Sequence, residues 1–317
     1  MKRLTPYQLF PLVGGLSLLA MWRDLAATAA LASRSDAYTH LAIIIPIAAT
    51  LALLTRRSQT IQPTRGVRTG LILLVVAAAI AAYPSLRGSY TLAGDTQLSL
   101  RMFAVVLWWI GAFVLCFGGR MFRLYAFPLC FLFWLVPLPE QTVNRMIVLL
   151  QQGSAAAAHE LFTLAGVPVM QDGVLLSVPG LTIQVAAECS SIRSSLMLAV
   201  ITLVLAHIFL RTIWGKIVIA LAIVPLAVFK NGVRVFTIAM LGAYFDPGIL
   251  DSRLHHQGGI IFLLLALIEV CALIWLIGKL ERLASAPSSG SIPPSSNLAP
   301  ALPAQRLSRG AASTARF

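Results

Sequence analysis

Charged residues are scarce in this chain, and acidic residues are the scarcest of them. Only 11% of the 317 residues are Asp, Glu, Lys or Arg, and only 11 residues are Asp or Glu. A soluble globular domain is charged at about a quarter of its positions, so water is not the solvent for most of this surface. Apolar residues make up 58% of the sequence. The composition excludes an ordinary soluble enzyme and predicts an integral membrane protein.

Long apolar runs recur along the chain and predict its fold class. A helix needs about 20 residues to cross a hydrocarbon core of about 30 Å. Eight runs suit a span, near residues 7–22, 37–55, 69–83, 102–118, 122–137, 192–210, 213–229 and 259–278. They do not alternate with polar residues, which disfavours a closed barrel. We therefore predict an all-α, polytopic membrane helix bundle of about eight transmembrane helices. Counts of seven or nine stay open, because residues 235–244 are a further apolar patch too short to span.

The placement of the cations predicts the orientation in the membrane. The formal charge of +13 would suggest a nucleic-acid binder in a soluble protein, but here the position of each cation matters more than the sum. With eight spans, most Lys and Arg residues fall on the side of the N-terminus, within 2–3, 56–68, 120–123, 211–216 and 279–316. Cytoplasmic loops of membrane proteins carry such an excess. We expect a multi-pass inner-membrane protein with both termini inside and no nucleic-acid partner.

Two segments interrupt the membrane pattern and suggest the domain organisation. Residues 138–191 predict an outer-face insertion, with an amphipathic helix near 142–165 and a small hairpin-like element within 167–185. The Ser-, Pro- and Ala-rich tail predicts a disordered cytosolic extension. The expected units are a five-helix membrane region (1–137), the outer-face segment (138–191), a catalytic membrane region (192–282) and the tail (283–317).

One of the four cysteines stands apart from the others. Cys116, Cys130 and Cys271 fall inside apolar runs, where a thiol packs as a small apolar group. Cys189 instead precedes the sixth run, in the sequence Ala-Glu-Cys-Ser-Ser-Ile-Arg that spans residues 187–193. The positive end of a helix lowers a thiol pKa and favours the nucleophilic thiolate. Cys189 is thus a candidate nucleophile, with packing at an interface as the competing interpretation.

Two further polar clusters are predicted at the same level of the membrane. Lys-Asn-Gly-Val-Arg occupies residues 230–234 after the seventh run, and residues 251–259 before the eighth contain His255 and His256. Adjacent histidines point in different directions on a helix, and no Cys, His and carboxylate spacing completes a metal shell. We predict neither a metal nor a cofactor. Glu269, inside the last run, is expected to be neutral or hydrogen-bonded, with His207 as one candidate partner.

The three clusters together resemble the exosortase/archaeosortase family. The similarity runs over about 120–280 and is carried by Ala-Glu-Cys189-Ser-Ser-Ile, Asn231-Gly-Val-Arg234 and His255-His-Gln-Gly-Gly259. The resemblance implies that Cys189 is the nucleophile, Arg234 the stabiliser of the oxyanion or thiolate, and His255 the proton donor. Asn231, His256, Glu188 and Ser190 are expected in supporting roles.

Two positions depart from the family pattern. Ser191 stands where many members have Gly, and His256 where the family often has Asp. Gly258 and Gly259 follow His255 at the family spacing, which favours His255 over His256.

The resemblance implies a membrane cysteine endopeptidase or transpeptidase. Its partners would be exported proteins with a C-terminal sorting signal of the PEP-CTERM type, and its active site would face the periplasm. The recognition motif, the acceptor (water or an amine of a lipid or glycan) and the oligomeric state stay open. The alternatives are a small-solute permease, with Arg234, Glu269 and His207 along its path, and a non-catalytic membrane factor for exopolysaccharide assembly.

Overall fold

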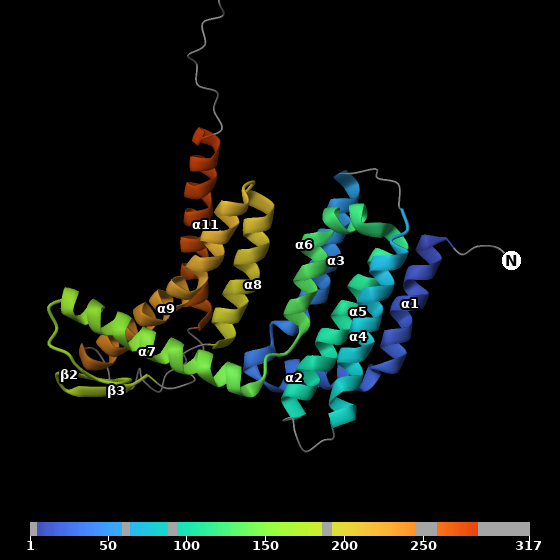
Figure 1. Cartoon of the computed structure of the whole chain (residues 1–317). Coiled ribbons are helices and arrows are strands. Elements are labelled where there is room, and N and C mark those ends of the chain that lie inside the picture. The colour runs from blue at the N-terminus through green and yellow to red at the C-terminus, as the bar shows by residue number, and fades with distance from the viewer. Residues whose placement is uncertain (1–4, 59–63, 88–93, 186–191, 245–258, 285–317) are drawn as a thin grey trace, which may run out of the picture.

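The computed structural model describes residues 5–58, 64–87, 94–185, 192–244 and 259–284, and nearly all of them are helical. Six helices are long and apolar enough to cross a membrane, and the number rises to eight if each of two bent helix pairs counts as one span. The predicted fold class, an all-α polytopic bundle of about eight spans with a small insertion, is confirmed. Figure 1 shows two groups of helices joined along one end by α7 and by α2.

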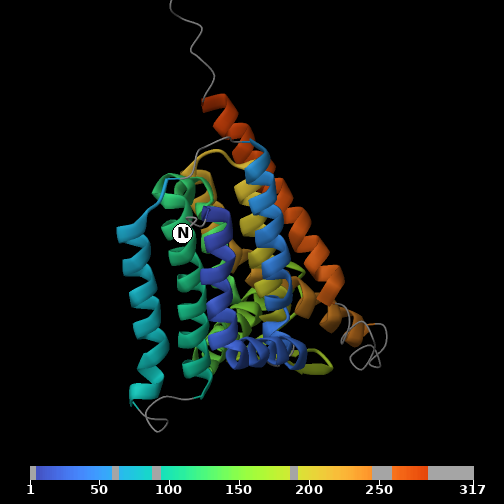
Figure 2. The ribbon, with the colours of Figure 1, turned by 90° about the vertical axis from the view of Figure 1, so that its right-hand side faces the viewer.

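The first group of helices contains the N-terminal half of the chain. Its elements are α1 (Pro6–Ala20), α2 (Trp22–Arg34), η1 (Asp36–Tyr38), α3 (Leu41–Ser58), α4 (Val67–Arg87), α5 (Gly94–Leu124), α6 (Ala126–Phe131) and η2 (Leu132–Leu135). The chain bends by 74° between α1 and α2. As Figure 2 shows, α2 consequently runs across the ends of the upright helices. Its amphipathic sequence suits that position at the edge of the apolar layer.

The closest helix contact in this group joins α4 to α5. A Cβ atom added at Gly70 would lie 2.5 Å from the Cα of Leu115, so only glycine allows the two backbones this approach. Between helices in lipid there is little hydrophobic driving force, and small residues permit the van der Waals contact that replaces it. Gly70 thereby fixes α4 against the long helix α5.

A layer at one end of the bundle follows η2 and consists of a long helix and a small sheet. The chain bends by 94° between the α6 and η2 pair and α7 (Glu140–Leu164), so α7 lies across the bundle end in Figure 1. The strands β1 (Met170–Asp172), β2 (Leu175–Val178) and β3 (Leu181–Gln184) form an antiparallel sheet in that order. The predicted helix near 142–165 is confirmed, and the predicted hairpin-like element has a third strand.

The second group of helices contains α8 (Ile192–Phe209), α9 (Ile213–Tyr244) and α11 (Gly259–Ala284). These helices share a buried core of aliphatic residues that includes Leu198, Ile219 and Ala266. At the end away from α7, the Glu281 carboxylate accepts the backbone N–H groups of Arg211 at 3.0 Å and Thr212 at 3.2 Å. A carboxylate at the unsatisfied N–H groups of a helix start is stabilising, so α11 holds the turn that begins α9.

Helix α9 corrects one predicted boundary. The seventh span was expected to end at residue 229, but α9 continues without a break to Tyr244. Its second half packs on α7 and the sheet, because Val235 and Ala239 share a buried core with Phe162 of α7 and Leu176 of β2. The patch at 235–244 is therefore not a separate span. It belongs to the second half of one long helix, which is covered by α7 and the sheet.

The predicted spans also differ from the helices elsewhere. The fifth one, near 122–137, contains the last residues of α5 and the short elements α6 and η2. Helix α5 is itself interrupted at Gly118, whose backbone leaves helical geometry. At the C-terminus α11 runs to Ala284, so the tail predicted from residue 283 begins inside that helix. The rest of the tail lies outside the described residues.

Candidate functional site

Of the seven residues predicted for the site, two lie in the part of the chain that the structure describes. Arg234 and Asn231 belong to α9. The others, Cys189, His255, His256, Glu188 and Ser190, lie outside the described residues. The site is therefore built here from α9 and from the helices that flank the segments carrying those five residues.

The polar stretch of α9 is buried rather than exposed at a helix end. The relative exposure is 1% for Lys230, 0% for Asn231 and 5% for Arg234. Lys230 and Arg234 are four residues apart, so their side chains leave α9 on the same face. Charged groups at this depth are costly unless other groups stabilise them, and in membrane proteins they mark functional sites by default. This face is the strongest polar feature of the described structure.

Lys230 connects this face to the start of α8. Its ammonium group donates a short hydrogen bond to the Oγ of Ser194, which lies in the first turn of α8. The N–H groups of a first helical turn lack partners within the helix and carry partial positive charge. Lys230 therefore adds a full positive charge at the positive end of α8.

Helix α7 packs against the side of α9 opposite to Lys230 and Arg234, and a glycine allows this contact. A Cβ atom added at Gly232 would lie 2.6 Å from the Cβ of Ala157, which is closer than real Cβ atoms approach. Gly232 therefore lets α7 and α9 touch at the level of Lys230 and Arg234. The layer of α7 and the sheet is thereby held against the side of α9 that faces away from Lys230 and Arg234.

The two ends of the segment that carries Cys189 are both anchored on α7. The backbone N–H of Val185 donates to the carbonyl of Val174 at 2.9 Å, and the carbonyl of Val185 accepts from the Nε2 of Gln151 at 2.9 Å. Ile192, which begins α8, is buried in one cluster with Leu150 of α7 and Ala227 of α9. Leu150 and Gln151 of α7 thus contact the residues on both sides of the segment that carries Cys189. On α9, Ala227 lies one turn before Lys230.

The ion pairs of this part of the molecule involve other residues. Arg193 is the basic residue closest to Cys189 in the sequence, but its guanidinium pairs with Asp36 at 2.9 Å and its side chain is 59% exposed. Within the described ranges, the ion pairs are Arg101 with Asp24, His159 with Glu160, and Arg193 with Asp36. None of them involves Lys230.

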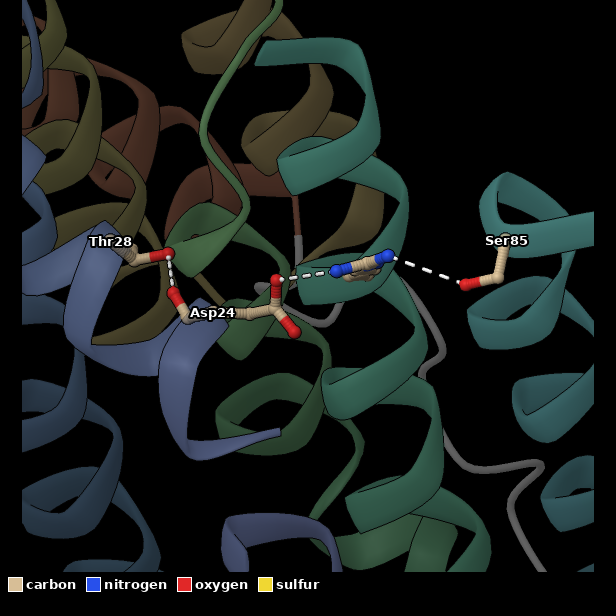
Figure 3. A network of polar contacts seen from close by, with 4 residues as sticks. Asp24, Thr28 and Ser85 are labelled. Carbon is tan, nitrogen blue, oxygen red and sulfur yellow. Dashed lines mark hydrogen bonds and ion pairs between the residues drawn. The ribbon is translucent and has the colours of Figure 1, made fainter. Parts of the chain in front are cut away.

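A second polar network lies in the N-terminal group. Arg101 on α5 connects Asp24 of α2 with Ser85 of α4, and both of these partners are labelled in Figure 3. Its Nη1 lies 3.3 Å from the Asp24 carboxylate, and its Nη2 donates to the Ser85 hydroxyl at 3.4 Å. The network borders a groove of about 600 Å³ whose α4 side is formed by Ala77, Ala78, Ala81 and Ala82. It binds three helices together near the end that α2 crosses.

The structure confirms some of the roles predicted for the other three cysteines and for Glu269 and contradicts others. Cys116 is fully buried, as expected for a packing thiol, whereas Cys130 and Cys271 are exposed on the apolar surface of their helices. Packing was thus the wrong role for those two. His207 stacks on Phe127 with ring centroids 3.7 Å apart, and the buried Oε2 of Glu269 has no hydrogen-bond partner among the described residues. Their suggested pairing is not observed there.

No group of three or more His, Cys, Asp or Glu side chains in the described part of the chain lies close enough together to hold a metal ion.

Sequence reasoning assigned no role to Lys230 or Ser194. The signal available was the spacing of Lys230 and Arg234, which on a continuous helix places both cations on one face. Ending the seventh span at residue 229 concealed that signal, because the two cations were then placed after the span rather than within one continuous helix. Ser194 carried no signal of its own, since its role depends on the packing of α8 against α9.

The apolar helices and the buried polar face define a multi-pass membrane protein with a polar site at one end of its bundle. The comparison with protein families matches the chain over residues 22–275 to the transmembrane exosortases. The chain therefore belongs to the transmembrane exosortase family, and its function is of the membrane exosortase type. Comparisons with curated proteins and with solved structures give no match.

Proposed function

We propose that this exosortase is a cysteine endopeptidase or transpeptidase that cleaves C-terminal, PEP-CTERM-like sorting signals of exported proteins. The observation that carries the proposal is the packing of both flanks of the Cys189 segment beside the buried Lys230 and Arg234 face of α9. An extended chain covers about 3.6 Å per residue, so three residues keep Cys189 within about 11 Å of Ile192. This reach is compatible with a position of Cys189 beside the start of α8, where Lys230 contacts Ser194.

The proposed reaction assigns one step to each catalytic residue. The Cys189 thiolate attacks the carbonyl carbon of the scissile peptide bond, and Arg234 stabilises the oxyanion of the tetrahedral intermediate. The C–N bond then breaks as His255 protonates the leaving amine, which leaves a thioester on Cys189. Water or an amine of a lipid or glycan attacks the thioester and restores the thiol. Asn231, His256, Glu188 and Ser190 orient these groups.

We propose an inner-membrane location with both termini inside and the α7 end facing the periplasm. Arg123 lies in the last turn of α5 and Arg282 in the last turn of α11, both at the end away from α7. Such cations favour the cytoplasmic side. A membrane-impermeant thiol reagent added to cells with a permeabilised outer membrane should therefore label Cys189. Labelling that requires lysis of the inner membrane would reverse the orientation.

Three substitutions test the activity: Cys189→Ala, Arg234→Ala and His255→Ala. Each is expected to leave a tail-bearing exported protein uncleaved while the enzyme stays in the membrane. Cys271→Ala is the matched control, because that thiol faces the apolar surface. The measurement is the ratio of full-length to processed partner on an immunoblot. Normal processing by the Cys189→Ala protein would refute the nucleophile and leave the permease and assembly-factor interpretations.

A further inference from the structure

Lys230 is the buried charge that the proposed reaction does not use. Its side chain is 1% exposed, and its hydrogen bond to Ser194 engages one of the three donors of the ammonium group. No ion pair of the described residues contains it. A buried ammonium without a carboxylate is costly, because desolvation is not offset by an opposite charge. In a membrane protein such a group marks a functional site by default.

The surroundings of Lys230 add to its positive potential. Arg234 lies one turn further along the same face of α9 and is also buried. Ser194, which holds the ammonium, lies in the first turn of α8, an 18-residue helix that begins at Ile192. The charges of Lys230 and Arg234 therefore add to the partial positive charge at the start of α8. In the sequence, Ile192 follows Cys189 by three residues.

We propose that Lys230 is a positioning residue of the exosortase site, which stabilises the negative charge that cysteine acyl transfer creates at the start of α8. The inference rests on the proposed function, because it takes Cys189 as the nucleophile. The thiolate is the anion present before substrate binds. An adjacent cation favours the ionised form of a thiol, and Ser194 holds the ammonium in place for this purpose.

The test measures the ionisation of Cys189 rather than cleavage. The full-length protein carries Cys116→Ala, Cys130→Ala and Cys271→Ala, which leave Cys189 as the single thiol of the four in the chain. Alkylation by iodoacetamide is followed from pH 5 to pH 10 in detergent micelles. Lys230→Met keeps the length of the side chain but removes the charge. We expect alkylation at pH 7 to slow about 3- to 10-fold, with a midpoint roughly 0.5–1 pH unit higher.

Two matched variants separate charge from packing. Lys230→Arg restores the cation and should keep the alkylation rate within about twofold of the parent. Lys216→Met removes a lysine from the other end of α9 and should leave the midpoint unchanged. An unchanged midpoint in folded Lys230→Met, or an equal shift in Lys230→Arg, overturns the proposal.

Ser194→Ala carries the same test if Lys230→Met does not accumulate as a folded protein. This variant keeps the Lys230 ammonium but removes the hydroxyl that positions it, so we expect a smaller upward shift of the alkylation midpoint. A midpoint equal to that of the parent overturns the proposal.

The outcomes also separate the role of Lys230 from the proposed function. Cleavage by the Cys189→Ala protein ends the proposed function, whereas loss of cleavage in that protein with an unmoved alkylation midpoint in Lys230→Met ends the role of Lys230 alone.

Discussion

Two cationic sites of this protein are built in opposite ways. In the N-terminal group, Arg101 is partly exposed and its charge is matched by the Asp24 carboxylate across 3.3 Å. In the second group, Lys230 is buried, holds a hydroxyl group and belongs to no ion pair of the described residues. The matched pair joins two helices, and each of its charges already has an opposite charge beside it. A buried cation without a carboxylate is retained at a cost in stability, which points to a role in function.

The largest expected effect comes from removing the guanidinium of the second site. Arg234→Gln should lower the initial rate of processing by about 100- to 1000-fold, as removal of one oxyanion donor does in other acyl-transfer enzymes. Arg234→Lys keeps the charge but loses the planar fork, so an intermediate rate is expected. The measurement is a time course of cleavage in isolated membranes. A rate within threefold of the parent in Arg234→Gln would remove the contrast between the two sites.

A smaller loss should follow from separating α7 from α9. Gly232→Ala introduces a Cβ atom against Ala157, and such overpacking typically costs about 1–3 kcal/mol. We expect a lower unfolding temperature in detergent and slower processing, because both flanks of the Cys189 segment depend on α7. Ala157→Gly in the same chain should restore both properties. Failure of this double variant to recover would contradict the direct contact of the two helices.

The matched site should respond in stability rather than in activity. Asp24→Asn removes the charge that matches Arg101 but keeps an oxygen that accepts a hydrogen bond, and partly exposed ion pairs of this kind contribute about 0.5–1 kcal/mol. We expect a small decrease in the unfolding temperature and processing within twofold of the parent. A decrease in processing as large as that of Arg234→Gln would show that the paired cation is also part of the reaction.

The smallest effect is expected at Arg193, although it is the cation nearest to Cys189 in the sequence. Its partner is Asp36, and both side chains are well exposed, so the pair is screened by solvent. Arg193→Gln should change the alkylation rate of Cys189 by less than twofold. A change comparable to that of Lys230→Met would mean that sequence proximity, rather than burial, decides which cation acts on the thiol.

Much of the fold was predictable because the membrane imposes it on the sequence. The bilayer requires long apolar helices, so hydropathy alone located α3, α4, α8 and α11 within a few residues. The second half of α9 was not predictable in this way. Its apolar residues are covered by α7 and the sheet instead of lipid, and a hydropathy pattern does not distinguish these two apolar surroundings.

The sequence by itself determined the class of this protein and the residue types of its site. Scarce charge and repeated apolar runs require a bilayer, and the short polar motifs at residues 189, 234 and 255 indicate the exosortase family. Only the tertiary structure decided which cations are buried and which are paired. Arg193 and Lys230 are both basic residues close to a helix end predicted from the sequence, yet one pairs with Asp36 and the other is buried against Ser194. That difference arises from packing between α8, α9 and α7, because burial and counter-charges come from residues distant in the sequence.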